Sequence, residues 1–310
     1  MARAAPLRLG TCLLFAALLV ACSSTPVKSE TVSAAKTEAS KNIGYGDGYY
    51  RQGRYDLALQ FYTQALSEYT SVDDGPGTVQ AYNDIGLSYV AIGSFDTAES
   101  LLVRARDRAR SVSPALVLVT SVSLGELYLA KGDAARALAT FQEAFALPAE
   151  ARTPVRTAIL YHDMGTAQKA LGDMSAALSS FQKSLEINVA NKLAQEAAGD
   201  YYMIASVYSK KGAFDEAIRN ALVALSLDKQ IENSPGIAKD LYALGLISAK
   251  KNDMASAYDY YQRAYLVFTT IGARSDVKKA LTELIAAADA LGRTSEADGF
   301  RKTLAELGAS

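Results

Sequence analysis

The sequence has little of the chemistry from which catalytic and metal sites are built. Its 310 residues include one histidine, two cysteines and no tryptophan. A structural or catalytic zinc site needs several His or Cys ligands, so we expect no metal centre and no cofactor. The sequence also lacks a glycine-rich phosphate loop, a G-x-S-x-G elbow and an H-E-x-x-H motif. These absences favour a protein that is not an enzyme.

An excess of either charge is also absent. Lys and Arg number 32 against 33 Asp and Glu, which gives a formal net charge of −1. A chain without a basic excess is poorly suited to bind a nucleic-acid backbone. Half of the residues are hydrophobic and 21% are charged, which is an ordinary globular composition with enough apolar side chains for a core.

Both cysteines lie close to the N-terminus. Arg3 and Arg8 precede an apolar run, Leu9–Val20, that contains Cys12 and ends shortly before Cys22. A run of about a dozen residues is too short for a permanent membrane-spanning helix, and this arrangement is typical of a signal peptide. Beyond the run Cys22 has no second cysteine to pair with, so we expect no disulfide.

The residues before Cys22 read LVA, and the segment resembles the lipobox of bacterial lipoproteins. The resemblance implies that residues 1–21 are cleaved and that Cys22 carries acyl chains such as palmitate, which hold a protein at a membrane durably. Because Ser rather than Asp follows, it also implies passage to the outer membrane, facing the periplasm. The alternative is an ordinary signal peptide with an incidental cysteine. Residues 22–38 have few large apolar side chains, which predicts a flexible tether.

The rest of the chain repeats with a period near 40 residues. One alanine recurs seven times, at intervals of 39 or 40 residues: Ala58, Ala98, Ala137, Ala177, Ala217, Ala257 and Ala297. Five residues before each alanine stands a turn residue: Gly53, Gly93, Gly132, Gly172, Gly212, Asn252 and Gly292. Glycine most easily accepts the left-handed conformation that ends helices, and asparagine is the usual second choice. The pattern predicts a helix, a tight turn and a second helix in every copy.

Three further positions support this register. Polar residues placed to cap the second helix follow the turn at Ser94, Asp133, Asp173 and Asp253. Small residues that let two helices approach closely occur seven residues before the turn, at Gly46, Gly86, Gly125, Gly165, Ala205 and Gly245. Five prolines fall between copies, where the helices are expected to end: Pro76, Pro114, Pro148, Pro154 and Pro235.

The second copy, YNDIGLSYVAIGSFDTAESLL, and the fourth, YHDMGTAQKALGDMSAALSSF, resemble the tetratricopeptide repeat, although that repeat usually has 34 residues. The resemblance implies an all-α, right-handed α-solenoid of helix–turn–helix repeats with a concave inner surface. We expect it to cover residues 39–310, with copies at about 39–78, 79–117, 118–157, 158–197, 198–237, 238–277 and 278–310. Gly44, Gly46 and Gly48 predict a frayed first helix.

First-helix residues that do not pack into the core are expected to line the concave groove. The candidates for peptide binding are Asn83, Leu87, Glu126, His162, Lys169, Tyr202, Lys210, Lys239, Tyr242 and Lys250. Asp47, Asp84, Glu126 and Asp163 make the early copies acidic, while the lysines belong to the later ones, which predicts a bipolar groove that orients a peptide. For any single charge, a solvated helix face is the alternative interpretation. His162 has no partner for metal binding, so we interpret it as lining the groove.

These features favour a non-enzymatic, membrane-anchored scaffold that binds a protein or peptide in the periplasm. The resemblance implies a role in assembling envelope complexes, such as a pilus, a secretion channel, envelope proteins or cell-wall hydrolases. One alternative is a receptor-like module for a small ligand or glycan, and another is a cell-wall enzyme whose carboxylates the spacing does not reveal. The partner's identity and the oligomeric state stay open.

Overall fold

The computed structural model describes residues 29–309, so Cys22 and the predicted cleavage site lie outside the described residues. Within that range the chain forms fourteen α-helices and one short 3-10 helix, with no strand. In chain order these are α1 (Ser29–Arg51), α2 (Tyr55–Ser71), α3 (Gly75–Ile92), α4 (Phe95–Arg110), α5 (Pro114–Ala130), α6 (Ala134–Phe145), η1 (Ala149–Ala151), α7 (Pro154–Ala170), α8 (Met174–Ala190), α9 (Ala194–Lys210), α10 (Phe214–Gln230), α11 (Ser234–Lys250), α12 (Met254–Thr270), α13 (Arg274–Ala290) and α14 (Thr294–Ala309).

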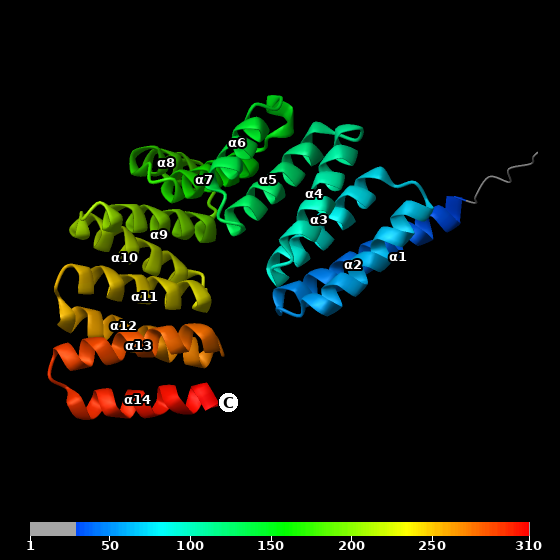
Figure 1. Ribbon diagram of the computed structural model, residues 1–310. Helices are drawn as coiled ribbons and strands as arrows, with labels where there is room; N and C mark the ends of the chain where they lie inside the picture. The colour runs from blue at the N-terminus through cyan, green and yellow to red at the C-terminus, as the bar shows by residue number, and fades with distance from the viewer. Residues whose placement is uncertain (1–28, 310) are drawn as a thin grey trace, which may run out of the picture.

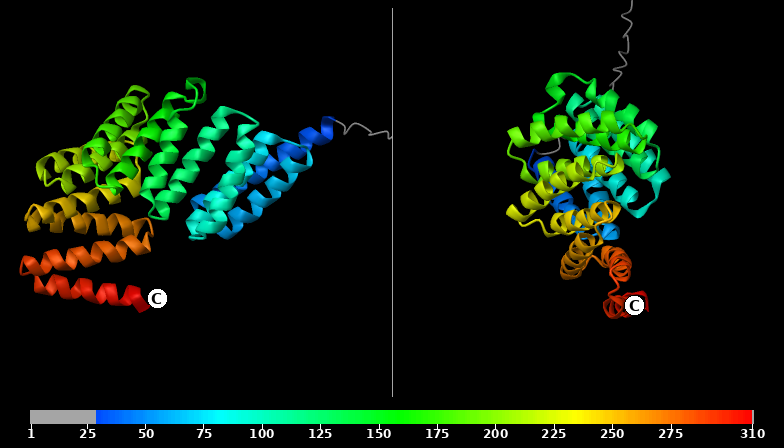
Figure 2. Two further views of the ribbon diagram at one scale, coloured as in Figure 1. Left: turned by 45° about the horizontal axis from the view of Figure 1, so that its top comes forward. Right: turned by 90° about the vertical axis from the view of Figure 1, so that its left-hand side faces the viewer.

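The helices stack as consecutive pairs along a curved path from α1 to α14 (Figure 1). Figure 2 shows the same array from two other directions, with the earlier and later pairs at different orientations. The first helices of successive pairs contact each other: α1 with α3, α3 with α5, α5 with α7, α7 with α9, and α9 with α11. Within residues 29–309, no two second helices contact each other as extensively. The first helices therefore line the inner face of the curve. The prediction of an all-α solenoid of helix–turn–helix repeats is confirmed.

The repeated glycines and alanines have the roles that their spacing predicts. All seven repeated alanines are fully buried, and all seven turn residues have positive φ, including Asn252 at 65°. A Cβ on Gly46 would overlap the ring of Tyr62, so the small residue permits the close approach of α1 and α2. Left-handed residues also occur at four joints between pairs, which the sequence pattern did not indicate: Asp73, Lys192, Glu232 and Gly272.

The helix caps follow the prediction at three of the four positions. The side chains of Asp133, Asp173 and Asp253 each accept a hydrogen bond from the backbone N–H three residues on, at 2.9 to 3.1 Å. Ser94 occupies the same place before α4, but its side chain makes no capping hydrogen bond.

The first helix differs from prediction in two ways. It begins at Ser29, so residues 29–38 are helical and are not part of a flexible tether. The reason is that Ala, Glu and Lys in this stretch favour helix, and Lys36 pairs with Asp74 of the next joint at 2.7 Å. The helix is also continuous through its glycines rather than frayed, because Tyr62 packs over Gly46 and donates a hydrogen bond to Asp47 at 2.8 Å.

The repeat boundaries also lie one helical turn earlier than predicted. First helices begin at residues 75, 114, 154, 194, 234 and 274, four residues before each expected boundary. Side chains at the joints set these starts: Asp74, Ser113, Thr153 and Asn233 cap the N–H groups of the new helix. Among the described residues, no helix combines the length and hydropathy needed to cross a bilayer.

Candidate functional site

Four carboxylates from successive first helices share the inner face of the early pairs. They are Asp47 on α1, Asp84 on α3, Glu126 on α5 and Asp163 on α7. The charge of Asp47 raises the pKa of Asp84, and the charge of Glu126 raises that of Asp163, so neighbours along the face lie within electrostatic reach. In the described part of the chain, none of the four pairs with a lysine or arginine.

Burial raises the pKa of three of these carboxylates, those of Asp84, Glu126 and Asp163. Burial, with a smaller contribution from Asp47, raises the pKa of Asp84 to about 7. Burial and the charge of Glu126 raise the pKa of Asp163 to about 7 as well. Glu126 is exposed at its tip, yet the surrounding inner face still raises its pKa by desolvation. A cation brought to this face would stabilise the ionised form of each group.

The basic end of the face begins on α7 and α9. Lys169 is half-buried, and its Nζ donates to Ser206 Oγ at 3.2 Å and lies 3.7 Å from Met203 Sδ. Burial lowers the pKa of Lys169, and the positive charge of Lys210 lowers it further. The structure thus brings these two predicted groove residues together.

The other predicted groove residues differ in accessibility. Lys239 and Lys250 are exposed near opposite ends of α11, about 16 Å apart along the helix. Leu87 is half-buried. Asn83 is only 6% exposed and its Oδ1 has no hydrogen-bond partner, which corrects the prediction of an accessible groove residue. The side chain turns into the packing between helices because its row lies on the flank of the inner face.

The two aromatic candidates pack against the edge of the core. Tyr202 is half-buried, and burial followed by the charge of Asp240 raises its pKa. The ring of Tyr242 lies 5.7 Å from that of Tyr261 and 6.4 Å from that of Phe268, both on α12. The ring of Tyr242 is therefore held against α12.

His162 belongs to a buried polar network that sequence reasoning missed. Its Nδ1 lies 2.7 Å from Asp200 Oδ1, and because a carboxylate only accepts, Nδ1 is the donor. Asp200 is fully buried, and its Oδ2 accepts from Asn188 Nδ2 at 2.8 Å. The repeat spacing gave a signal for this network, because Asn188 and Asp200 are followed forty residues later by two aspartates, Asp228 and Asp240. Residues 29–309 bring no three His, Cys, Asp or Glu side chains into a metal-binding arrangement.

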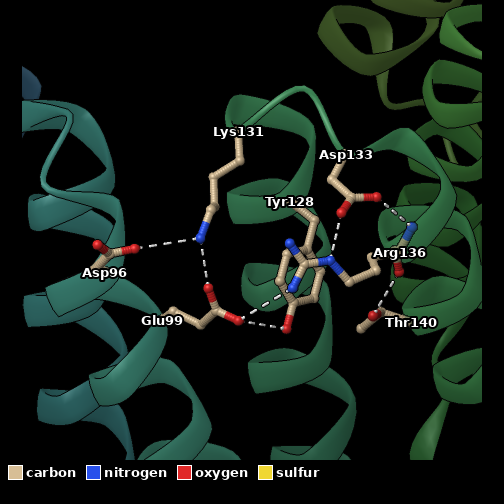
Figure 3. Close-up of polar contacts among 7 residues, drawn as sticks. All are labelled: Asp96, Glu99, Tyr128, Lys131, Asp133, Arg136 and Thr140. Carbon is tan, nitrogen blue, oxygen red and sulfur yellow. Dashed lines mark hydrogen bonds and ion pairs between the residues drawn. The ribbon is translucent and has the colours of Figure 1, made fainter.

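Elsewhere the charges are matched. At the edge where α4, α5 and α6 meet, Lys131 Nζ lies 2.7 Å from Glu99 and 3.5 Å from Asp96 (Figure 3). Tyr128 donates to Glu99 at 3.3 Å, and the guanidinium of Arg136 stacks over the Tyr128 ring at 4.6 Å. The hydrogen bond from Lys131 is the main reason that the pKa of Glu99 is lowered. This network joins the second pair to the third, whereas the inner-face carboxylates have no such cation.

The paired helices define a helical-repeat solenoid, and comparison with known proteins gives the family. Models of the tetratricopeptide repeat match residues 37–111, 116–188 and 201–231, which together span more than half of the chain. The chain belongs to the tetratricopeptide-repeat family. A search of curated proteins found no match.

Several solved structures share the fold. The apo form of the quorum sensor NprR from B. thuringiensis is 19% identical, with a TM-score of 0.67 over 90% of this chain and 81% of that one. A Rap protein complexed with Competence and Sporulation Factor is 16% identical, with a TM-score of 0.66 over 92% and 81%. Aspartyl phosphate phosphatase F from Bacillus subtilis is 13% identical, with a TM-score of 0.66 over 90% and 72%. At these identities the likeness concerns the fold alone.

Proposed function

We propose that the protein is a non-enzymatic scaffold that binds a protein or peptide on the inner face of its first helices. One observation carries the proposal: four carboxylates on successive first helices have no cationic partner, and Lys169 and Lys210 follow them along the same face. Complementary potentials fix the orientation of a bound chain and exclude wrong partners. The acidic end would receive the basic part of the partner, and the basic end its acidic part.

The structural neighbours support a binding function. One is a quorum sensor and another is a Rap protein that was solved in complex with Competence and Sporulation Factor. Another is a phosphatase, but burial without a cation already accounts for the raised pKa values of the inner-face carboxylates here. We therefore retain binding, rather than catalysis, as the function.

We also propose that Cys22 carries a lipid anchor at the outer membrane and that the scaffold assembles envelope complexes in the periplasm. The LVAC motif supports this. Because α1 begins at Ser29, the six residues that separate it from Cys22 reach at most about 20 Å. Such a short connection would keep the first helix pair near the membrane and raise the local concentration of envelope partners.

Lipidation has a direct test. Cys22→Ser should accumulate as an uncut precursor that incorporates no radiolabelled acyl chain in growing cells. Normal cleavage of this variant would contradict the lipid anchor, but it would leave the binding function of the inner face untouched.

Photo-crosslinking from defined positions tests the binding surface. A photoreactive residue placed at Thr166 or Ser206, on first helices of the inner face, should give discrete protein adducts in intact cells that mass spectrometry identifies. Gln182 is exposed on the second helix α8 and serves as the matched control. Adducts of equal yield from Gln182 would contradict the proposed surface.

A further inference from the structure

A small pocket opens where the first turns of α7 and α9 meet the end of α8. Its volume is about 210 Å³, and its lining includes Val155, Ile159, Asp163, Asn188, Glu196 and Gly199. Pockets for small-molecule ligands usually measure about 300–1,000 Å³. The pocket therefore has the size for one side chain of a larger partner rather than for a free metabolite.

Two buried oxygen atoms in the pocket lining lack a donor. Asp163 Oδ2 and Asn188 Oδ1 are inaccessible to water and have no hydrogen-bond partner within the described chain. Asn188 is only 4% exposed. Its amide orientation is fixed because Nδ2 donates to Asp200 at 2.8 Å, which leaves Oδ1 to accept. Buried acceptors are rarely left unpaired, so these two oxygens point to a ligand group that donates hydrogen bonds.

The rest of the lining combines an apolar part, an acidic part and the polar side chains of His162 and Ser184. Val155 and Ile159 lie one turn apart on α7 and are 41% and 40% exposed, which is high for large aliphatic side chains. Glu196 adds a carboxylate at the exposed side, and the charge of Glu126 reaches Asp163. Lysine and arginine combine a methylene stem that packs on apolar surface with a charged head that donates hydrogen bonds. They match the apolar and the acidic part of the lining.

We propose that this pocket binds a lysine or arginine side chain of the partner. The stem packs against Val155 and Ile159, and the ammonium or guanidinium pairs with the carboxylates of Asp163 and Glu196, which both line the pocket. This inference rests on the proposed binding function and adds the residue type that the inner face selects. A neutral side chain of equal length would fill the pocket but leave both carboxylates without a cation, and sites built for a hydrogen-bonding group reject such analogues strongly.

The test uses the full-length chain and two blocked pentapeptides, acetylated and amidated, with either lysine or norleucine between pairs of alanines. Titration is followed by NMR at the backbone amide of Gly199. The lysine peptide should bind at least about tenfold more tightly than the norleucine peptide. Equal affinities would overturn the proposal, as would equal binding of an unblocked alanine peptide that carries only an α-amine. Neither comparison depends on a variant that might misfold.

A pair of variants distinguishes the contribution of the pocket to peptide affinity from that of the general negative charge of the inner face. Asp163→Asn should weaken the lysine peptide about tenfold, while Asp47→Asn, which removes the same charge on α1, should change it less than about twofold. Equal losses would overturn the pocket. If inner-face crosslinks capture a partner segment without Lys or Arg, the pocket proposal fails and the proposed function stands. If the inner face captures nothing, the function fails while the peptide comparison still tests the pocket.

Discussion

Two joints between helix pairs occupy the same register forty residues apart, yet their buried aspartates have different partners. Between α8 and α9, the Asn188 amide donates to the buried carboxylate of Asp200, whose other oxygen accepts from His162. Between α10 and α11 the corresponding residues are Asp228 and Asp240, both buried. Asp228 accepts from Asn233 at 3.0 Å, but Asp240 Oδ2 has no partner.

The second joint consequently depends on a proton. Burial, followed by the charge of Asp228 and its hydrogen bond, raises the pKa of Asp240 to about 8. At neutral pH the proton of Asp240 therefore lies between the two carboxyls, whereas Asp200 has hydrogen bonds to Asn188 and His162. The comparison indicates that a carboxyl in place of the amide at this position leaves the neighbouring aspartate without a donor and makes the joint respond to pH.

The largest effect should come from removing the carboxylate of the first joint. Asp200→Ala leaves the Asn188 amide and His162 Nδ1 without an acceptor inside the protein, so we expect a loss of about 3 kcal/mol in the free energy of unfolding. Asp240→Ala removes a carboxyl that has no donor except a shared proton, so its cost should be clearly smaller. Urea denaturation measures both variants, and equal losses would break the comparison between the joints.

Reciprocal exchanges test the proton dependence itself. The pKa of Asp240 in the folded chain, about 8, lies above its ordinary value of 3.8, so the stability gained from its proton is complete below about pH 4 and is lost as the pH rises through 8. Asp228→Asn supplies an amide donor and should stabilise the chain by roughly 2 kcal/mol near pH 9, with little effect near pH 4.

Asn188→Asp is the reverse exchange and should destabilise the chain increasingly as the pH rises. Urea titrations of both variants and of the unaltered chain, repeated between about pH 5 and about pH 9, give the differences directly. The differences between variants also cancel the similar pH dependence contributed by Asp84 and Asp163. Stability differences that do not change with pH would contradict a shared proton at the second joint.

The smallest effect concerns the capping position before the second helices, where three copies have Asp and the second copy has Ser. Ser94→Asp gives α4 the residue that caps α6, α8 and α12, and it should stabilise the chain by about 0.5 kcal/mol. Asp173→Ser makes the opposite exchange before α8 and should cost a similar amount. Thermal unfolding of both variants at one pH measures these changes. Opposite shifts of similar size would show that the capping hydrogen bond causes the difference in stability.

The sequence predicted the fold because the repeat encodes it seven times. A buried alanine and a left-handed turn residue recur at a fixed distance, and each has a direct physical role in one helix pair. The start of α1 was not predictable in the same way. Residues 29–38 carry no repeat signal, and their helix is stabilised partly by Lys36 reaching Asp74 in the following joint.

The candidate site was predictable only in part. The first-helix register predicted Asp84, Glu126 and Asp163 along one face, and the structure shows that burial raises the pKa of all three. The burial of Asn83 and the pocket beside Asp163 depend on how three helices meet, so one helix pattern does not reveal them.

Calorimetry with the partner segment identified by crosslinking tests the central claim, binding to a bipolar inner face, most directly. Lys210→Glu combined with Lys250→Glu reverses two exposed charges on first helices, and Lys183→Glu combined with Lys229→Glu makes the same change on α8 and α10. We predict that the first double variant binds at least about tenfold more weakly and that the second stays within about twofold of the unaltered chain. Equal affinity of the two double variants would contradict the account.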